Sequence, residues 1–168
     1  MQSTHHIFAD DGDVPNHPRF PLIVYAGAID AKAGDPAVTF ETLFQANGWG
    51  GGWRNGIFPF HHYHSTAHEV LAIARGEAEV RFGGEAGKTL SVKAGDAVLI
   101  PAGVGHKRLS ASHDLLVIGA YPGGQWADLM REGAEDKAGI RARIAGVAVP
   151  KLDPVAGEDG PVQALWKR

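Results

Sequence analysis

Three histidines and one glutamate stand at spacings that predict a metal-binding site. His62 and His64 are two residues apart in a strand-like run, so their side chains share one face of the strand. Glu69 opens the next apolar run, where it shares a face with Leu71 and Ile73. A carboxylate on an apolar wall needs a positive partner, because desolvating an unpaired charge costs several kcal/mol. Two neutral imidazoles cannot neutralise it, whereas a divalent cation can.

His106, at the start of a later strand, is the fourth candidate ligand. Three imidazoles and one carboxylate suit Fe, Mn, Ni, Co or Zn, and the ligand types alone do not fix which divalent transition metal binds. Such a set leaves one or two coordination positions open for water or substrate, as in catalytic sites. We therefore expect one metal ion held by His62, His64, Glu69 and His106.

Arg108 lies two residues after His106 and is expected on the same strand face. In a pocket, its guanidinium would hold a substrate carboxylate by a two-pronged contact, which makes it the candidate catalytic-site anion clamp. The alternative is an exposed charge at the rim.

Other side chains near the expected metal ligands have less defined roles. We expect His61 on the outer face, at the surface or in an interface. His68 neighbours Glu69 and so faces away from it, as a surface residue or a support for the ligands, with a place among the ligands as the alternative. Phe58 and Phe60 are expected to line the pocket floor or the core.

These residues lie in a stretch, from about 53 to 121, of short runs separated by glycine-bearing turns. Such runs are typical of an antiparallel sandwich or barrel. The predicted strands are 58–64, 69–75, 77–82, 89–92, 97–101, 105–109 and 115–121, preceded by one at 21–25. A helix is predicted over 36–46, because Asp35 is a suitable N-cap and Pro36 suits the first helical position.

The two ends of the chain are predicted to decorate this barrel. Residues 1–18 should form an irregular arm that contains His5 and His6 in a disordered end, and Trp49–Trp53 either a lid or a packed connector. After the barrel, Trp126, Leu129 and Met130 fit one face of a short helix. Residues 135–145 fit another helix, and Leu165–Trp166 should dock on the barrel.

We therefore expect residues 1–168 to form a single domain. Its barrel core spans about 53–121, its N-terminal arm and helix 1–52, and its C-terminal extension 122–168. A chain of 168 residues is about one domain at the usual ~150 residues per domain.

Composition excludes several function classes. The absence of cysteine excludes a disulfide scaffold, thiolate zinc sites, iron–sulfur clusters and a cysteine nucleophile. The net charge of −3 is spread without basic clusters, which argues against nucleic-acid binding. No stretch approaches the ~18 apolar residues of a membrane span, and the first residues lack a signal-peptide pattern. A cytoplasmic protein is expected.

Two segments resemble the paired motifs of the cupin superfamily. They are Gly56-x5-His62-x-His64-x4-Glu69-x6-Gly76 and Gly95-x5-Pro101-x-Gly103-x2-His106, together covering residues 56–106. The usual family Asn four residues after the last histidine is Ser110 here. The wider sequence resembles a group of small single-domain bacterial cupins, the YjlB type. The resemblance implies an all-β double-stranded β-helix (jelly roll), a divalent metal on His62, His64, Glu69 and His106, and a homodimer.

The resemblance does not imply one reaction, since cupins include enzymes and plain binders. Our first hypothesis is a mononuclear-metal enzyme, of dioxygenase or isomerase type, acting on a small organic acid or carbohydrate. The second is a non-catalytic module that binds or senses a small molecule. The third is a structural metal site. An open coordination position facing a pocket of a few hundred Å³ favours the first two, whereas a sealed site favours the third.

Overall fold

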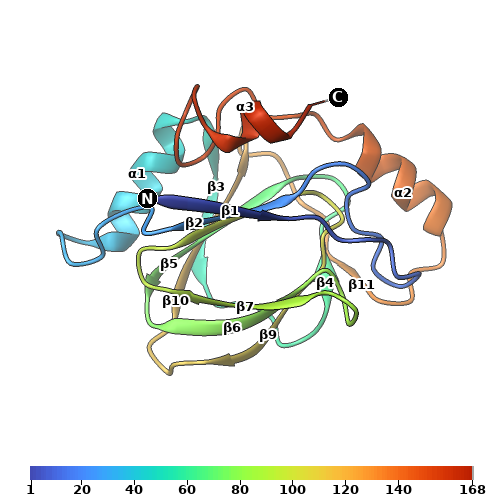
Figure 1. Cartoon of the computed structure of the whole chain (residues 1–168), viewed down its shortest axis with the longest axis horizontal. Helices are drawn as coiled ribbons and strands as arrows, with labels where there is room; N and C mark the ends of the chain where they lie inside the picture. The colour runs from blue at the N-terminus through green and yellow to red at the C-terminus, as the bar shows by residue number, and fades with distance from the viewer. Residues whose placement is uncertain (168) are drawn as a thin grey trace.

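Two antiparallel sheets face each other to form a double-stranded β-helix, as the sequence predicted (Figure 1). The structure is a computed structural model that describes residues 1–167. One sheet has the strand order β1-β2-β8-β5-β10-β3 and the other β11-β4-β9-β6-β7. The first contains β1 (Gln2–His6), β2 (Leu22–Ala26), β3 (Trp49–Asn55), β5 (Glu69–Arg75), β8 (Ala97–Ile100) and β10 (Leu116–Pro122). The second contains β4 (His62–Tyr63), β6 (Glu77–Phe82), β7 (Lys88–Lys93), β9 (His106–Ala111) and β11 (Met130–Arg131).

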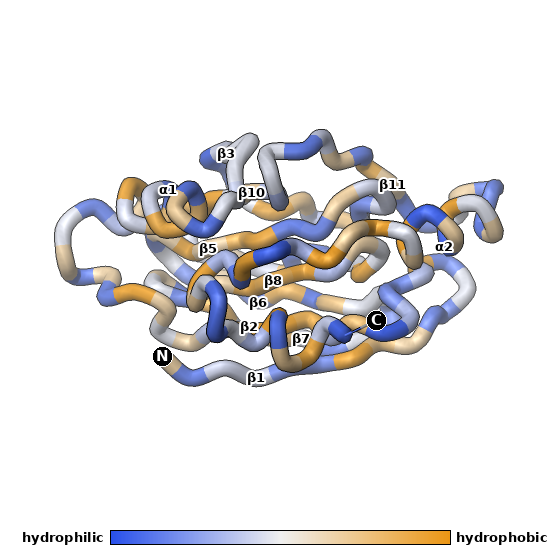
Figure 2. The backbone as a smooth tube through the Cα atoms, turned by 90° about the horizontal axis from the view of Figure 1, so that it is seen from above, coloured by the Kyte–Doolittle hydropathy of each residue, from blue (hydrophilic) through white to orange (hydrophobic). Residues whose placement is uncertain are grey.

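Strand β5 is buried on both faces and divides two apolar clusters. Leu71 and Ile73 belong to the cluster between the sheets, while Val70 and Ala72 belong to the cluster outside the six-stranded sheet. Hydrophobic residues accordingly run along β5 and β8 (Figure 2). Because Glu69 follows the alternation of Leu71, the fold directs its carboxylate between the sheets.

Helix α1 (Pro36–Ala46) covers the outside of the six-stranded sheet and has the predicted bounds. The Asp35 carboxylate caps it by accepting hydrogen bonds from the backbone N–H groups of Ala37 and Val38 at 2.9 and 3.5 Å. Phe40 and Phe44 are the large side chains that the helix buries against the sheet.

The N-terminal prediction was wrong in part. Residues 2–6 form an edge strand that pairs with β2, so His5 and His6 lie in regular structure. Most of its side chains are exposed, and backbone pairing with β2 holds the strand in place. A polar sequence without apolar alternation does not indicate such pairing. The Trp49–Trp53 segment is likewise part of a strand, β3, which pairs with β10.

The C-terminal extension packs on the barrel through two helices, α2 (Lys137–Gly146) and α3 (Pro161–Leu165). Trp166 docks as predicted, with its ring stacked at 5.2 Å on Phe20. The predicted helix at 126–130 is wrong, because residues 126–129 form no regular element and Met130 begins β11, which pairs with β4. Among the described residues, no helix has the length and apolar character needed to cross a membrane.

Candidate metal centre

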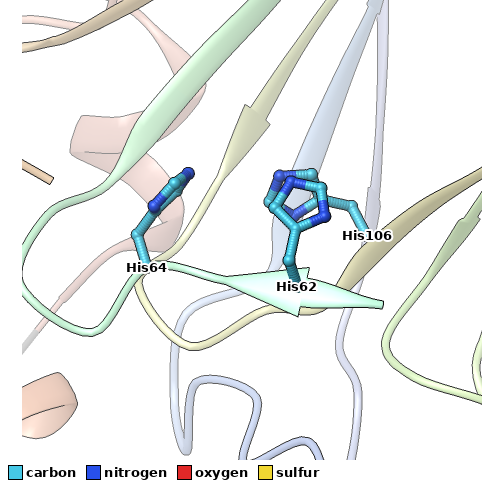
Figure 3. A group of neighbouring side chains, drawn as sticks. All are labelled: His62, His64 and His106. Atoms are coloured by element: carbon cyan, nitrogen blue, oxygen red, sulfur yellow. The ribbon is translucent and has the colours of Figure 1, made fainter. Parts of the chain in front are cut away.

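Strands β4 and β9 bring three histidines together. His62 and His106 are paired opposite each other across these strands, with ring centroids 3.9 Å apart. His64 follows β4 and points into the same space (Figure 3). One ring nitrogen from each histidine lies within 4.8 Å of the others. The strand predicted over 58–64 is much shorter, yet His62 and His64 share a face as expected.

Each of these rings has its Nδ1 against a backbone carbonyl. His62 Nδ1 lies 3.0 Å from the Phe60 oxygen, and His106 Nδ1 lies 3.2 Å from the Val104 oxygen. His64 Nδ1 contacts the oxygen of Asp128. A carbonyl only accepts hydrogen bonds, so each Nδ1 must donate and carries the proton. This arrangement leaves Nε2 of each neutral ring as the lone-pair donor, the tautomer that metal-binding histidines need.

Glu69 closes the same cluster from β5. Its Oε2 lies 3.1 Å from His64 Nε2 and 3.3 Å from His106 Nε2, and the residue is only 2% exposed. The ring atoms that would donate to a metal are therefore the atoms that the carboxylate approaches. The donor set of imidazole nitrogens and a buried carboxylate fits a borderline divalent metal.

The close contact between Glu69 and the histidines shifts the pKa values of these groups. Burial lowers the pKa of His64, but the adjacent Glu69 charge outweighs burial and raises it to about 9. Burial raises the pKa of Glu69, while His64 and His106 hold it below its usual value. Burial and the neighbouring His106 lower the pKa of His62 to about 3. The two opposite shifts favour an ion pair between His64 and the Glu69 carboxylate, with His62 neutral.

The cluster forms one wall of a cavity of about 440 Å³. Arg108, which is half-buried, lines this cavity together with His106. No salt bridge joins its guanidinium to a carboxylate among residues 1–167. Phe58 also lines the cavity and is 48% exposed, which places it toward solvent.

Sequence reasoning missed Tyr121 as a cavity residue and placed Trp53 only in a lid or a packed connector. They come from β3 and β10, and Trp53 Nε1 donates a hydrogen bond to the Tyr121 hydroxyl at 3.0 Å. Burial and the nearby Glu69 charge raise the pKa of Tyr121, so its hydroxyl stays protonated beside the cluster. Neither residue belongs to a histidine motif, and only the pairing of β3 with β10 brings them here.

Two predicted surface histidines are buried. His61 is 5% exposed, and its Nε2 lies 2.7 Å from Glu85 Oε2. His68 is fully buried beside Phe20 and Trp166, and its Nδ1 accepts the backbone N–H of Ala102. The surface alternatives for these two histidines are therefore wrong, and for His68 the rings of Phe20 and Trp166 pack over the side chain. Phe60, expected at the pocket floor, stacks on Phe58 instead and lies under Arg131.

Comparison with known proteins identifies the class of this fold and site. Residues 54–117 match the family model of the cupin domain. The chain belongs to the cupin superfamily. Within it, the chain is of the YjlB type, being 44% identical over 161 residues to the uncharacterised protein YjlB of Bacillus subtilis (strain 168). That alignment covers 96% of this chain and 94% of YjlB.

Solved structures show more distant similarity. An acireductone dioxygenase from Bacillus anthracis with cadmium in its active centre is 17% identical, with a TM-score of 0.38, over 50% of this chain and 57% of that one. A TDP-quinovose 3,4-ketoisomerase from Campylobacter jejuni is 10% identical, with a TM-score of 0.42, over 54% and 73%.

Proposed function

We propose that this chain is a mononuclear-metal enzyme that acts on a small organic acid, or on a carbohydrate with an acidic group. His62, His64, Glu69 and His106 hold one divalent transition metal. The observation that carries the proposal is the position of this ligand set on the wall of a cavity of about 440 Å³, which Arg108 also lines.

The open cavity favours a reactive site over a structural one. A structural metal closes its coordination shell with protein ligands, whereas this cluster faces a volume in the range of small-molecule sites. Three rings whose Nδ1 atoms are held by backbone carbonyls, and a buried carboxylate beside Nε2 of two of them, are the donors that such a metal requires.

The chain's own groups supply recognition. Arg108 pairs with the substrate carboxylate, and its guanidinium is free to do so because no described carboxylate occupies it. The Tyr121 hydroxyl, held by Trp53 Nε1, offers a polar contact between substrate and ligand cluster. When bound, the metal supplies Lewis-acid polarisation of a substrate oxygen or a site for O₂, the chemistry of isomerases and dioxygenases.

Metal analysis of protein purified without chelator tests the site. Wild type should contain close to one metal ion per chain, and the variants Glu69→Gln and His106→Ala should contain much less. His113 is exposed and does not line the cavity, so the control variant His113→Ala should retain the metal. Unchanged metal content in the first two variants would show that the ligand assignment is wrong.

The substrate class is tested with oxygen-consumption and isomerisation assays across small carboxylic acids and sugars. Arg108→Gln should weaken acid binding by about 10- to 100-fold, since a charged hydrogen bond contributes roughly 1.5–3 kcal/mol. Neutral sugars should bind both proteins equally. Equal acid binding by both proteins contradicts the clamp, and tight binding without turnover would instead support the sensing module.

The assembly and location expected from the sequence belong to this proposal. Sedimentation velocity should show a homodimer, and cell fractionation should recover the protein in the cytoplasm. A species at the 17.8 kDa mass of one chain contradicts the dimer.

A further inference from the structure

The segment after β10 binds the turn that carries His64. The Asp128 carboxylate accepts hydrogen bonds from the backbone N–H groups of Ser65 and Thr66, at 2.6 and 3.2 Å. It also accepts from both hydroxyls, at 3.2 Å for Thr66 Oγ1. In return, Asp128 N–H donates to Thr66 Oγ1 at 3.0 Å. One residue of the C-terminal extension therefore binds both backbone N–H groups and both hydroxyls of Ser65 and Thr66.

The same residue contacts His64 directly. Its backbone oxygen accepts the Nδ1 proton of His64, so this contact fixes both the tautomer and the orientation of the ring. The equivalent carbonyls for His62 and His106 come from residues two positions earlier in the chain. His64 is the one ring of the three whose Nδ1 partner comes from 64 residues away.

Helix α2 reinforces the contact. Arg143 Nη1 donates to Ser65 Oγ at 2.8 Å and lies 3.6 Å from Asp128 Oδ2. Asp128 is only 8% exposed. Burial raises its pKa, but the hydrogen bonds from Ser65 and Thr66 outweigh this and keep the carboxyl ionised. A charged, buried acceptor with this many donors holds one geometry.

We propose that Asp128 is a positioning residue, which holds the His64 ring in place for the metal through the turn at residues 64–66. This inference rests on the proposed metal site. It assigns a role to the C-terminal extension, because Asp128 lies outside the matched cupin domain at residues 54–117.

Co²⁺ titration of the metal-free protein, read in the visible spectrum, tests this role. Asp128→Ala should bind Co²⁺ about 10- to 100-fold more weakly, the usual effect of removing such outer contacts. Its ligand-field bands should shift, because the His64 ring is reoriented. Asp128→Asn keeps an oxygen for the two backbone N–H groups, so it should recover most of the affinity and the wild-type bands.

Two further variants keep the test decisive. Asp136→Ala is the matched control, since this exposed carboxylate of the same extension caps α2 by accepting from Gly139 N–H at 3.0 Å. It should lower the stability of the fold, as loss of a helix cap does, without changing Co²⁺ affinity. If Asp128→Ala does not fold, Thr66→Val replaces it, because it removes the hydroxyl contacts in similar volume and should still weaken Co²⁺ binding several-fold.

The outcomes separate the two proposals. Wild-type affinity and bands in Asp128→Ala, or in Thr66→Val where that variant replaces it, overturn the positioning role and leave the metal site standing. A wild-type protein that binds no Co²⁺ overturns the metal site and, with it, this inference. Weaker binding with unshifted bands assigns Asp128 to general stability and also overturns the positioning role.

Discussion

At the scale of residues, histidine performs two different tasks in this protein. His62, His64 and His106 present Nε2 to the cavity, whereas His17 and His68 are buried structural rings. His17 Nδ1 accepts the backbone N–H groups of Arg19 and Phe20 at 3.2 and 2.9 Å. A ring that accepts hydrogen bonds at Nδ1 and is stacked on Phe20 is stable only when neutral.

His17 therefore predicts acid sensitivity of the fold. Burial, with a contribution from Arg19, lowers its pKa to about 4 from 6.5, so the unfolded chain binds the proton more readily. Its stabilising contribution is complete above pH 6.5 and is lost as the pH falls toward 4. By pH 5 the loss should reach about 2 kcal/mol, at roughly 1.4 kcal/mol per pKa unit.

The check is urea unfolding of wild type and His17→Asn at pH 7.5 and pH 5. Asn does not titrate, and its side-chain oxygen can accept the same N–H groups. Between pH 7.5 and pH 5, the free energy of unfolding of the variant should therefore fall by about 2 kcal/mol less than that of wild type. The same loss in both proteins would show that His17 does not cause the acid sensitivity.

At the scale of elements, strand pairing shapes the cavity. Strand β10 lies between β3 and β5, and its register against β3 shifts between Gly119 and Tyr121. Gly119 is the residue over which the Trp53 indole lies, since a Cβ there would meet Trp53 Cε2 at 2.1 Å. The missing side chain thus makes room for the indole that holds the Tyr121 hydroxyl.

Gly119→Ala should displace Trp53 and deform the cavity. We expect a loss of about 1–3 kcal/mol in urea unfolding, as for overpacked sites, together with weaker acid binding. Gly146→Ala is the matched control, because a Cβ there meets no atom within 4 Å at the end of α2. Unchanged acid binding in Gly119→Ala would contradict this role for the indole.

At the scale of the whole molecule, the end of the C-terminal extension covers the outer face of the six-stranded sheet. Trp166 is 3% exposed, stacks on Phe20 and donates through Nε1 to the Pro21 oxygen at 2.9 Å. Asp153 is fully buried nearby and accepts the Tyr25 hydroxyl at 2.6 Å. The outer face of the six-stranded sheet is therefore a second core.

Trp166→Ala should destabilise the fold by about 3–5 kcal/mol, the usual effect of truncating a buried aromatic ring. Guanidinium unfolding measures this change. Trp126→Ala is the control, because Trp126 is 76% exposed and its removal should change stability by less than about 0.5 kcal/mol. Similar losses in the two variants would contradict the second core.

The sequence by itself determined most of the barrel strands between residues 69 and 122, the helix at 36–46 and the face shared by His62 and His64. These follow from alternation along a strand and from local capping, which depend on neighbours in the chain. Glu69 was predictable as a buried carboxylate for the same reason. The edge strand at residues 2–6 was not, because only backbone pairing holds its polar residues.

Only the tertiary structure decided which side chains surround the cluster of three histidines and Glu69. Tyr121 and Asp128 reach it from strands and segments distant in sequence, and no local pattern marks either residue. The apolar spacing at residues 126–130 favoured a helix, but Asp128 in this segment binds the distant backbone N–H groups of Ser65 and Thr66, and no helix forms. His61 and His68 were misplaced for the same physical reason: burial depends on which segments pack over a ring, and that is a property of the folded chain.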